Sequence, residues 1–238
     1  MVIGLTRLPG ENNKDYAYRM IRESIMSLQL KPGQSIGEVE LAQALNLSRT
    51  PIREVLAKLR EEHLVVVIPQ VGTYISKINL QLIMEASFMR YTLEKEVLKQ
   101  ACESFPKTSM FDLKKNMVLQ KELIGQKGRE RDFHTLDKEF HRIIFMGAMK
   151  KHIWEAILRI STHYNRIRLL SEMQHSFDEA IEQHERIVEI LEDKDCDRVE
   201  EIVREHIIEP IKLWEDLLIE NSPYLNFFEQ LDQKPVFQ

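Results

Sequence analysis

Two residues that can bind a metal ion lie at core positions of a strongly amphipathic segment in the second half of the chain. Asp137 and His141 are four residues apart, so in a helix they share one face and can hold a single ion together. They stand where leucines are expected, in an apolar stripe that also contains Phe140 and Ile144. The pattern indicates an acid and an imidazole buried side by side.

His184 and His206 interrupt two further apolar stripes in the same way. A single histidine on an apolar face is more often a hydrogen-bonded core residue than a ligand. Burying three imidazoles and a carboxylate without partners is costly, however, and one divalent cation would satisfy them together. This donor set suits Zn²⁺ best, with Ni²⁺ or Mn²⁺ possible, and it has too few oxygens for Ca²⁺.

Arg90 shares a predicted buried stripe with Ile83, Leu93 and Val97. A guanidinium beside a metal ion could clamp a small carboxylate effector with two hydrogen bonds. The alternative is a structural ion pair with Glu94. The other histidines outside the first 76 residues are expected at the surface or in supporting positions: His134, His152, His163 and His175.

A second kind of chemistry is indicated by the stretch NLSRTPIREVLAKLREEHL, residues 46–64. At helical spacing its apolar residues form a core stripe, and Arg49 and Arg53 fall together beside that stripe. The arginines could bind guanine or phosphate, and the Ser48 and Thr50 hydroxyls could bind phosphate. The alternative is a well-capped helix with solvated arginines.

The elements around this helix predict a winged helix-turn-helix over residues 1–77. A helix, a Pro-Gly break, a short helix and a three-residue turn precede it, and the β-branched run LVVVIP and the segment TYIS follow as a hairpin. Gly72 lies at the hairpin tip, where a glycine would let the backbone approach a minor groove.

Residues 78–238 predict an all-α bundle followed by a C-terminal tail. Tyr224, Phe227 and Phe228 indicate that this tail docks on the rest of the protein. Helices are expected at about 79–104, 109–126, 130–148, 150–172, 177–193 and 196–220.

Charge and composition set limits on these expectations. The 238 residues carry a net charge of −5, but the first 76 hold nine Lys and Arg against eight Asp and Glu. A nearly neutral head does not forbid a local basic face. Two cysteines without CxxC spacing exclude a zinc knuckle, and no apolar run approaches a membrane span. We therefore expect a cytoplasmic protein that does not bind a membrane.

Residues 15–76 resemble the DNA-binding domain of the GntR family of bacterial transcription regulators, whose signature centres on Ser-Arg-Thr-Pro-Val-Arg-Glu-Ala-Leu. Ile52 and Val55 are mild departures from it, and Val39 replaces a residue that is basic or polar in many members. The resemblance implies DNA contacts from Arg49, Thr50, Arg53 and Gly72.

The segments LDKEFHRIIF, QHERIVEIL and VREHI are similar to the FCD ligand-binding domain of the FadR subgroup. Its metal-binding members use an Asp-x-x-x-His pair and two later histidines. The resemblance implies that the ligands here are Asp137, His141, His184 and His206. It also places Arg90 at the arginine of an Arg-x-x-Leu-Glu pattern.

Together these patterns predict a ligand-responsive transcription regulator that binds a pseudo-palindromic operator on double-stranded DNA as a homodimer. A metal and Arg90 would hold a small organic acid. One alternative is a helical-bundle metalloenzyme with an accessory winged-helix module, although the two Glu-x-x-His motifs of a di-iron bundle are not both present and His-Glu-x-x-His does not occur. Another is a structural metal combined with an apolar ligand.

Overall fold

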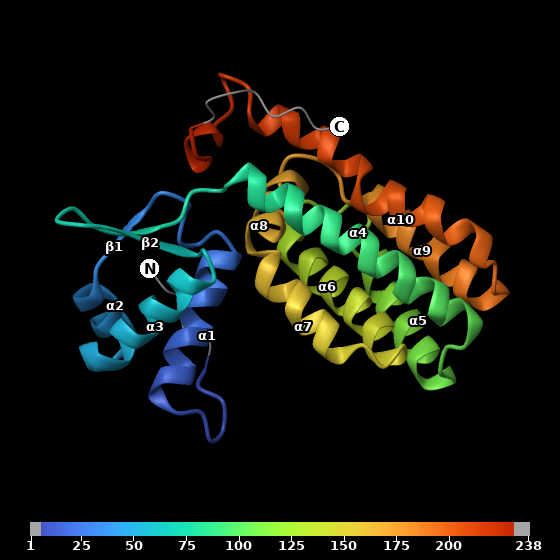
Figure 1. The fold of residues 1–238 in the computed structure, drawn as a ribbon, viewed down its shortest axis with the longest axis horizontal. Helices are drawn as coiled ribbons and strands as arrows, with labels where there is room; N and C mark the ends of the chain where they lie inside the picture. Colours follow the sequence, from blue (N-terminus) through green and yellow to red (C-terminus); the bar gives the residue numbers. More distant parts are fainter. Residues whose placement is uncertain (1–5, 231–238) are drawn as a thin grey trace.

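The computed structural model describes residues 6–230 and shows a mainly helical protein in two parts. A small domain with a three-stranded sheet lies at the left of Figure 1, and a helical bundle lies at the right. The long helix α4, Leu80–Glu103, begins at the junction and runs along the bundle. The predicted fold class, a winged helix-turn-helix followed by a helical domain, is confirmed.

The small domain is a winged helix-turn-helix. It contains α1 (Asn13–Met26), α2 (Glu38–Leu45) and α3 (Arg49–Glu61). The turn between α2 and α3 begins at Asn46, whose left-handed backbone (φ +53°) suits asparagine. The stripe expected on α3 is fully packed inside, and its members are Ile52, Val55, Leu56 and Leu59. This packing leaves the arginine face of α3 outward.

The wing is a three-stranded antiparallel sheet in the order β1–β3–β2. The predicted hairpin is formed by β2 (Val65–Ile68) and β3 (Gly72–Ile75), with Val66 opposite Tyr74. The third strand, β1 (Ser35–Ile36), pairs with the other edge of β3. Sequence analysis missed β1 because two residues are too few to show an alternating pattern.

The helical part packs around one large apolar core and a smaller one near the junction. Its remaining elements are α5 (Lys107–Lys121), α6 (Glu130–Gly147), α7 (Lys151–Ile160), α8 (Thr162–Glu172), α9 (Asp178–Asp193), η1 (Cys196–Arg198), α10 (Val199–Ile207), η2 (Glu209–Leu217) and η3 (Leu225–Phe227). Figure 1 shows α4, α9 and α10 side by side along the bundle.

Two of the long helices predicted from the sequence are interrupted. The segment 150–172 is broken at Ser161, and the new direction lets α8 reach the winged domain. The segment 196–220 is α-helical only in α10. Pro210 cannot donate a backbone hydrogen bond and conflicts with the carbonyl one turn earlier, so the chain continues as the 3₁₀ helix η2.

The segment after η2 folds back onto the linker between the two parts. The sequence predicted such docking of the C-terminal tail. Ile78 donates its N–H to the Phe227 carbonyl (2.7 Å) and accepts from the Glu229 N–H (3.0 Å). Phe228 is buried in the core near the junction. Residues 231–238, the rest of the predicted tail, lie outside the described residues. Within residues 6–230, no helix has the length and apolar character needed to cross a membrane.

Candidate metal centre and DNA-binding helix

Helices α6, α9 and α10 bring the four predicted metal ligands together in the buried interior of the bundle. One ligand atom from each of Asp137, His141, His184 and His206 lies within 4.8 Å of the others. His206 Nε2 is 3.1 Å from His141 Nε2 and 3.2 Å from His184 Nε2. Asp137 Oδ1 is 3.4 Å from His184 Nε2 and 3.7 Å from His141 Nε2.

Each imidazole is oriented by a hydrogen bond from its other ring nitrogen. His141 Nδ1 donates to Glu94 Oε2 (2.8 Å), His184 Nδ1 to Gln120 Oε1 (2.7 Å) and His206 Nδ1 to Gln183 Oε1 (2.8 Å). When a ring is neutral with its proton on Nδ1, its Nε2 keeps a lone pair, and in that form all three lone pairs face the cluster.

Hydrogen bonds also fix which way the side-chain amides of Gln120 and Gln183 point. Gln120 Nε2 donates to Asn116 Oδ1 (2.6 Å), and Asn116 Nδ2 donates to the Leu136 carbonyl (3.1 Å). Gln183 Nε2 donates to Glu179 (3.4 Å). Because these amide NH₂ groups are used as donors, the Gln120 and Gln183 oxygens must accept from the histidines. The chain of bonds therefore sets the tautomers of His184 and His206.

Arg168 on α8 holds the carboxylate of the cluster. Its two terminal nitrogens donate to the two oxygens of Asp137, at 2.8 and 2.9 Å. Burial would favour a neutral Asp137, but Arg168, His141 and His184 together keep its pKa well below the ordinary value. Asp137 is therefore available as an anionic ligand. Sequence analysis missed Arg168, because its own segment carries no pattern that links it to Asp137.

The imidazoles differ in proton affinity. Burial, only partly offset by Asp137, lowers the pKa of His184 to about 4. Burial and the other two histidines lower the pKa of His206 well below its usual value. Burial also acts to lower the pKa of His141, but Glu94 and Asp137 outweigh it, so the pKa of His141 is raised. Two of the three rings are therefore neutral at physiological pH and able to ligate a cation.

Arg90 forms the ion pair with Glu94 that the sequence analysis gave as the alternative to effector binding. Its Nε donates to Glu94 Oε1 (2.6 Å), and both side chains are almost completely buried. Burial would raise the pKa of Glu94, but Arg90 and His141 lower it to about 2. Arg90 thus supports the carboxylate that orients His141. A direct contact between Arg90 and an effector stays a prediction.

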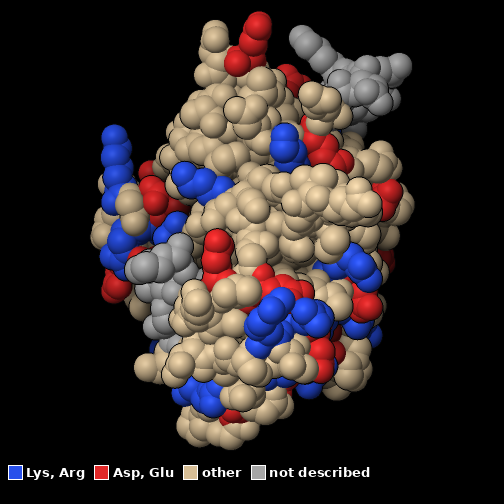
Figure 2. Space-filling view, turned by 90° about the vertical axis from the view of Figure 1, so that its left-hand side faces the viewer, with Lys and Arg blue, Asp and Glu red and all other residues tan. Residues whose placement is uncertain are grey.

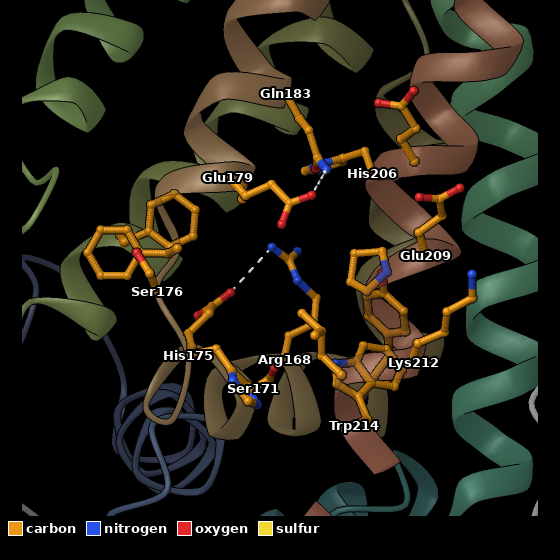
Figure 3. A pocket seen from close by; sticks show the side chains of 18 residues that line it. Arg168, Ser171, His175, Ser176, Glu179, Gln183, His206, Glu209, Lys212 and Trp214 are labelled. Atoms are coloured by element: carbon orange, nitrogen blue, oxygen red, sulfur yellow. Dashed lines mark hydrogen bonds and ion pairs between the residues drawn. The ribbon is translucent and has the colours of Figure 1, made fainter. Parts of the chain in front are cut away.

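A cavity of about 250 Å³ opens beside the cluster, between α8, α9 and η2. Arg168, Gln183 and His206 line its inner side, and Glu179, Glu209 and Lys212 lie around it in Figure 3. The Arg168 guanidinium points into the centre of this view. The many polar groups in its wall argue against a purely apolar ligand.

The predicted DNA-contacting residues of the recognition helix are exposed. Ser48 occupies the N-cap position of α3, and Ser48, Arg49 and Thr50 all face solvent. The side chains of Arg49 and Arg53 are 60% and 67% exposed. Both arginines bind Glu38 at the start of α2, Arg53 through Nε (3.0 Å) and a terminal nitrogen (2.9 Å). Glu38 therefore keeps the two arginine side chains next to each other on the surface.

Gly72 is the first residue of β3, immediately after the hairpin turn. Its φ of +154° lies in a region that other residues rarely adopt, which explains the glycine here. In Figure 1 the hairpin projects away from the bundle. Figure 2 looks onto this end of the molecule and shows basic and acidic side chains interspersed rather than a continuous basic surface. Any DNA contact must depend on the placement of individual side chains.

The two parts of the molecule are joined by α8. His163 Nε2 donates to the His63 carbonyl (2.9 Å), and its Nδ1 accepts from the Asn79 N–H (3.0 Å). Arg166 donates to the Ser76 carbonyl (2.8 Å). Burial and Arg166 lower the pKa of His163 to about 3. The sequence placed His163 at the surface or in a supporting role, whereas it is a buried bridge to the winged domain.

Comparison with known proteins identifies both domains. The model of the bacterial regulatory proteins of the gntR family matches residues 13–75, and the FCD domain matches residues 85–209. The chain belongs to the gntR family. Its resemblance to the FCD-containing members, predicted from the sequence, is thereby confirmed.

Individual relatives agree with this assignment. The HTH-type transcriptional repressor RspR of Escherichia coli is 30% identical over 210 residues, covering 88% of this chain and 92% of its own. The Nta operon transcriptional regulator of Aminobacter aminovorans is 25% identical, covering 76% and 85%. The solved structure of E. coli McbR/YncC superimposes with a TM-score of 0.74 at 18% identity, covering 86% and 98%. This gntR-family chain is therefore a transcription regulator and not an enzyme.

Proposed function

We propose that this gntR-family protein is a ligand-responsive cytoplasmic regulator that binds a pseudo-palindromic operator as a homodimer and senses a small organic acid at a metal centre. The observation that carries the metal centre is the set of three Nε2 lone pairs aimed at one another and at Asp137. Without a cation between them, these donors would repel one another.

The spacing of the donors fits a first-row metal ion. Bonds of about 2.1 Å place two ligand atoms about 3.0 Å apart at a right angle and about 3.4 Å apart at a tetrahedral angle. Four of the six donor separations, at 3.1 to 3.7 Å, lie close to this range, and all six are within 4.8 Å. Zn²⁺ is the first choice for three imidazoles and one carboxylate, and Ni²⁺ or Mn²⁺ would accept further oxygen ligands.

The effector would enter through the cavity of about 250 Å³, which reaches His206 and Arg168. A bound metal ion would attract a carboxylate, and Lys212 could add a second contact near the opening. The effector can change the free energy of DNA binding only by the difference in its own binding free energy between two arrangements of the domains. This coupling is commonly about 1–3 kcal/mol. α8 contacts both Asp137 and the winged domain, so it would sense the occupied site.

DNA recognition is assigned to α3, with the wing as a second contact. The amino end of α3 would enter the major groove with Arg49 and Arg53, and the backbone at Gly72 would approach the adjacent minor groove. Ser48 and Thr50 would contact phosphates that fix the position of the helix.

A homodimer would place two such helices on the two halves of an operator. The outer face of α5 supports such an assembly because it exposes Phe111 (69%), Val118 (59%) and Leu119 (41%). Several large apolar side chains exposed on one helix can mark a protein interface. Light scattering of wild type and of Phe111→Glu with Val118→Glu would show whether the dimer uses this face.

The decisive experiment is selection of genomic DNA fragments by the purified protein at moderate salt. We expect enrichment of fragments that share an inverted repeat, and a change in the bound fraction when the matching organic acid is added. Failure to enrich any sequence would overturn the regulator function, whereas enrichment of single half-sites would overturn the homodimer.

A further inference from the structure

A second cavity, larger than the pocket beside the metal ligands, lies apart from that pocket. Its volume is about 510 Å³, within the range of small-molecule sites. One wall is α1 of the winged domain and the other is formed by α6, α7 and α8 of the bundle. A molecule in this space would touch both domains at once.

The cavity is lined by both apolar and charged side chains. Met20 and Met26 of α1 face Leu158 and Leu169 of the bundle, which together give an apolar body to the cavity. Charged groups also line it: Arg22, Glu23, Arg131, His134 and Lys138. The cavity therefore suits a molecule with an apolar body and a charged group.

The charges that remain unpaired are mainly positive. Arg22 binds Glu62 (3.0 Å), and His134 binds Glu172 (2.9 Å). Arg131, Lys138 and Glu23 form no ion pair within residues 6–230, so two cationic groups remain against one carboxylate. These groups reach solvent, and a small anion at the cavity could accept charge-assisted hydrogen bonds from the two cations.

Hydrogen-bonding groups without partners lie in the same cavity. The Ser27 hydroxyl is shielded from solvent and has no hydrogen-bond partner among the residues described. Asn165 is partly exposed, and its side-chain amide makes no hydrogen bond to another side chain or backbone group within the described ranges. Lys138 and Asn165 also line a small cavity of about 20 Å³ that touches Asp137 and His141. Polar groups thus gather where the large cavity approaches the metal ligands.

We propose that the cavity between α1 and the bundle is a second ligand site, specific for an amphipathic organic anion. The anionic group binds Lys138 and Asn165, and the apolar body packs on Met20, Met26, Leu158 and Leu169. Its occupant would join α1 to α6 and α8. Because Arg22 links the same α1 wall to Glu62 at the end of α3, the occupant lies one contact away from the recognition helix.

The test uses two fluorescent probes that differ only by a sulfonate, namely 8-anilino-1-naphthalenesulfonate and the uncharged N-phenyl-1-naphthylamine. We expect the wild-type protein to bind the sulfonate more tightly than the uncharged probe. Lys138→Gln should weaken binding of the sulfonate roughly tenfold and leave the uncharged probe unchanged, because one charge-assisted contact is lost. Lys194→Gln, an exposed lysine at the end of α9, is the matched control and should bind both probes as wild type does.

A second variant tests the cavity itself. Thr135 lines the cavity from α6 and is solvent-exposed, so Thr135→Trp should fill the space without disturbing a core and should weaken both probes. Metal content of Lys138→Gln, measured in parallel, should equal that of wild type. Equal affinity of wild type for the two probes would overturn the anion assignment. Unchanged binding in both Lys138→Gln and Thr135→Trp would overturn the site.

Discussion

The Nε2 atoms of His141 and His206 lie 3.1 Å apart, and the Nδ1 atom of each ring is already committed to an oxygen acceptor. Two imidazole lone pairs at this separation need a positive centre between them, either a metal ion or a proton. With His184 and Asp137 converging on the same point, the arrangement favours a metal ion shared by four ligands.

The first prediction concerns metal content. Wild-type protein should retain about one divalent ion per chain, and His184→Ala with His206→Ala should retain none because two of the four ligands are removed. Elemental analysis after gel filtration measures this directly. His152→Ala, a histidine with a side chain 90% exposed, is the control and should match wild type. Equal metal in the double variant would place the ion elsewhere.

The second prediction concerns the groups that orient the ligands. Gln120→Leu removes the acceptor of His184 Nδ1 while leaving all four ligands in place. Metal affinity should fall about 10- to 100-fold, as is usual when an orienting partner is lost. Competition with a chromogenic chelator gives the affinity, and the exposed Gln100→Leu is the control. An unaltered affinity would mean that packing alone holds the His184 ring.

The third prediction concerns DNA. Arg53→Ala should lose roughly 1–3 kcal/mol of discrimination between operator and altered operator, with a smaller loss of affinity for unrelated DNA. Arg60→Ala, an exposed arginine farther along α3, is the control and should keep its discrimination. Binding assays on both DNAs at two salt concentrations separate the effects. A loss that is equal for all sequences would reassign Arg53 to phosphate.

The fourth prediction concerns pH. The pKa of His163 is lowered from 6.5 to about 3 in the folded protein, so the unfolded chain binds the proton first as pH falls. Stability of the junction should therefore be complete above pH 6.5 and decline progressively toward pH 3. A protonated ring could no longer accept the Asn79 N–H and would face Arg166.

Thermal unfolding of wild type and His163→Gln between pH 7.5 and 5 measures this effect. Glutamine can still donate and accept but does not titrate, so its melting temperature should depend less on pH. His152→Gln is the control, because that side chain is 90% exposed and its partner is Glu155 on its own helix. Parallel pH curves for wild type and His163→Gln would assign the acid sensitivity to other groups.

Much of the fold and the metal ligands could be predicted from the sequence, because periodicity marks buried faces. Asp137, His141, His184 and His206 were recognisable since each interrupts an apolar stripe that must face inward. The residues that orient them were harder to recognise. Gln120 and Asn116 are neutral amides on a helix with little amphipathic contrast, so nothing in their local pattern marks them as buried.

Contacts between elements distant in sequence could not be predicted in the same way. Arg168 meets Asp137, and His163 meets His63, from α8, which begins after the helix break at Ser161. A single serine in an otherwise helical pattern does not signal an interruption. The role of Arg90 was also undetermined, since a buried guanidinium four residues before Glu94 fits either an ion pair or a ligand contact.

The pairing of Ile78 with Phe227 and Glu229 has a consequence for the order in which the protein matures. The winged domain leaves the ribosome early and holds its own apolar core, so it can fold while the rest of the chain is being translated. The contacts of α8 with His63 and Ser76 can form earlier, but the linker at Ile78 cannot complete its pairing until residue 229 has emerged from the exit tunnel. A nascent regulator would therefore carry a folded DNA-binding head held by α8 alone until translation reaches that point.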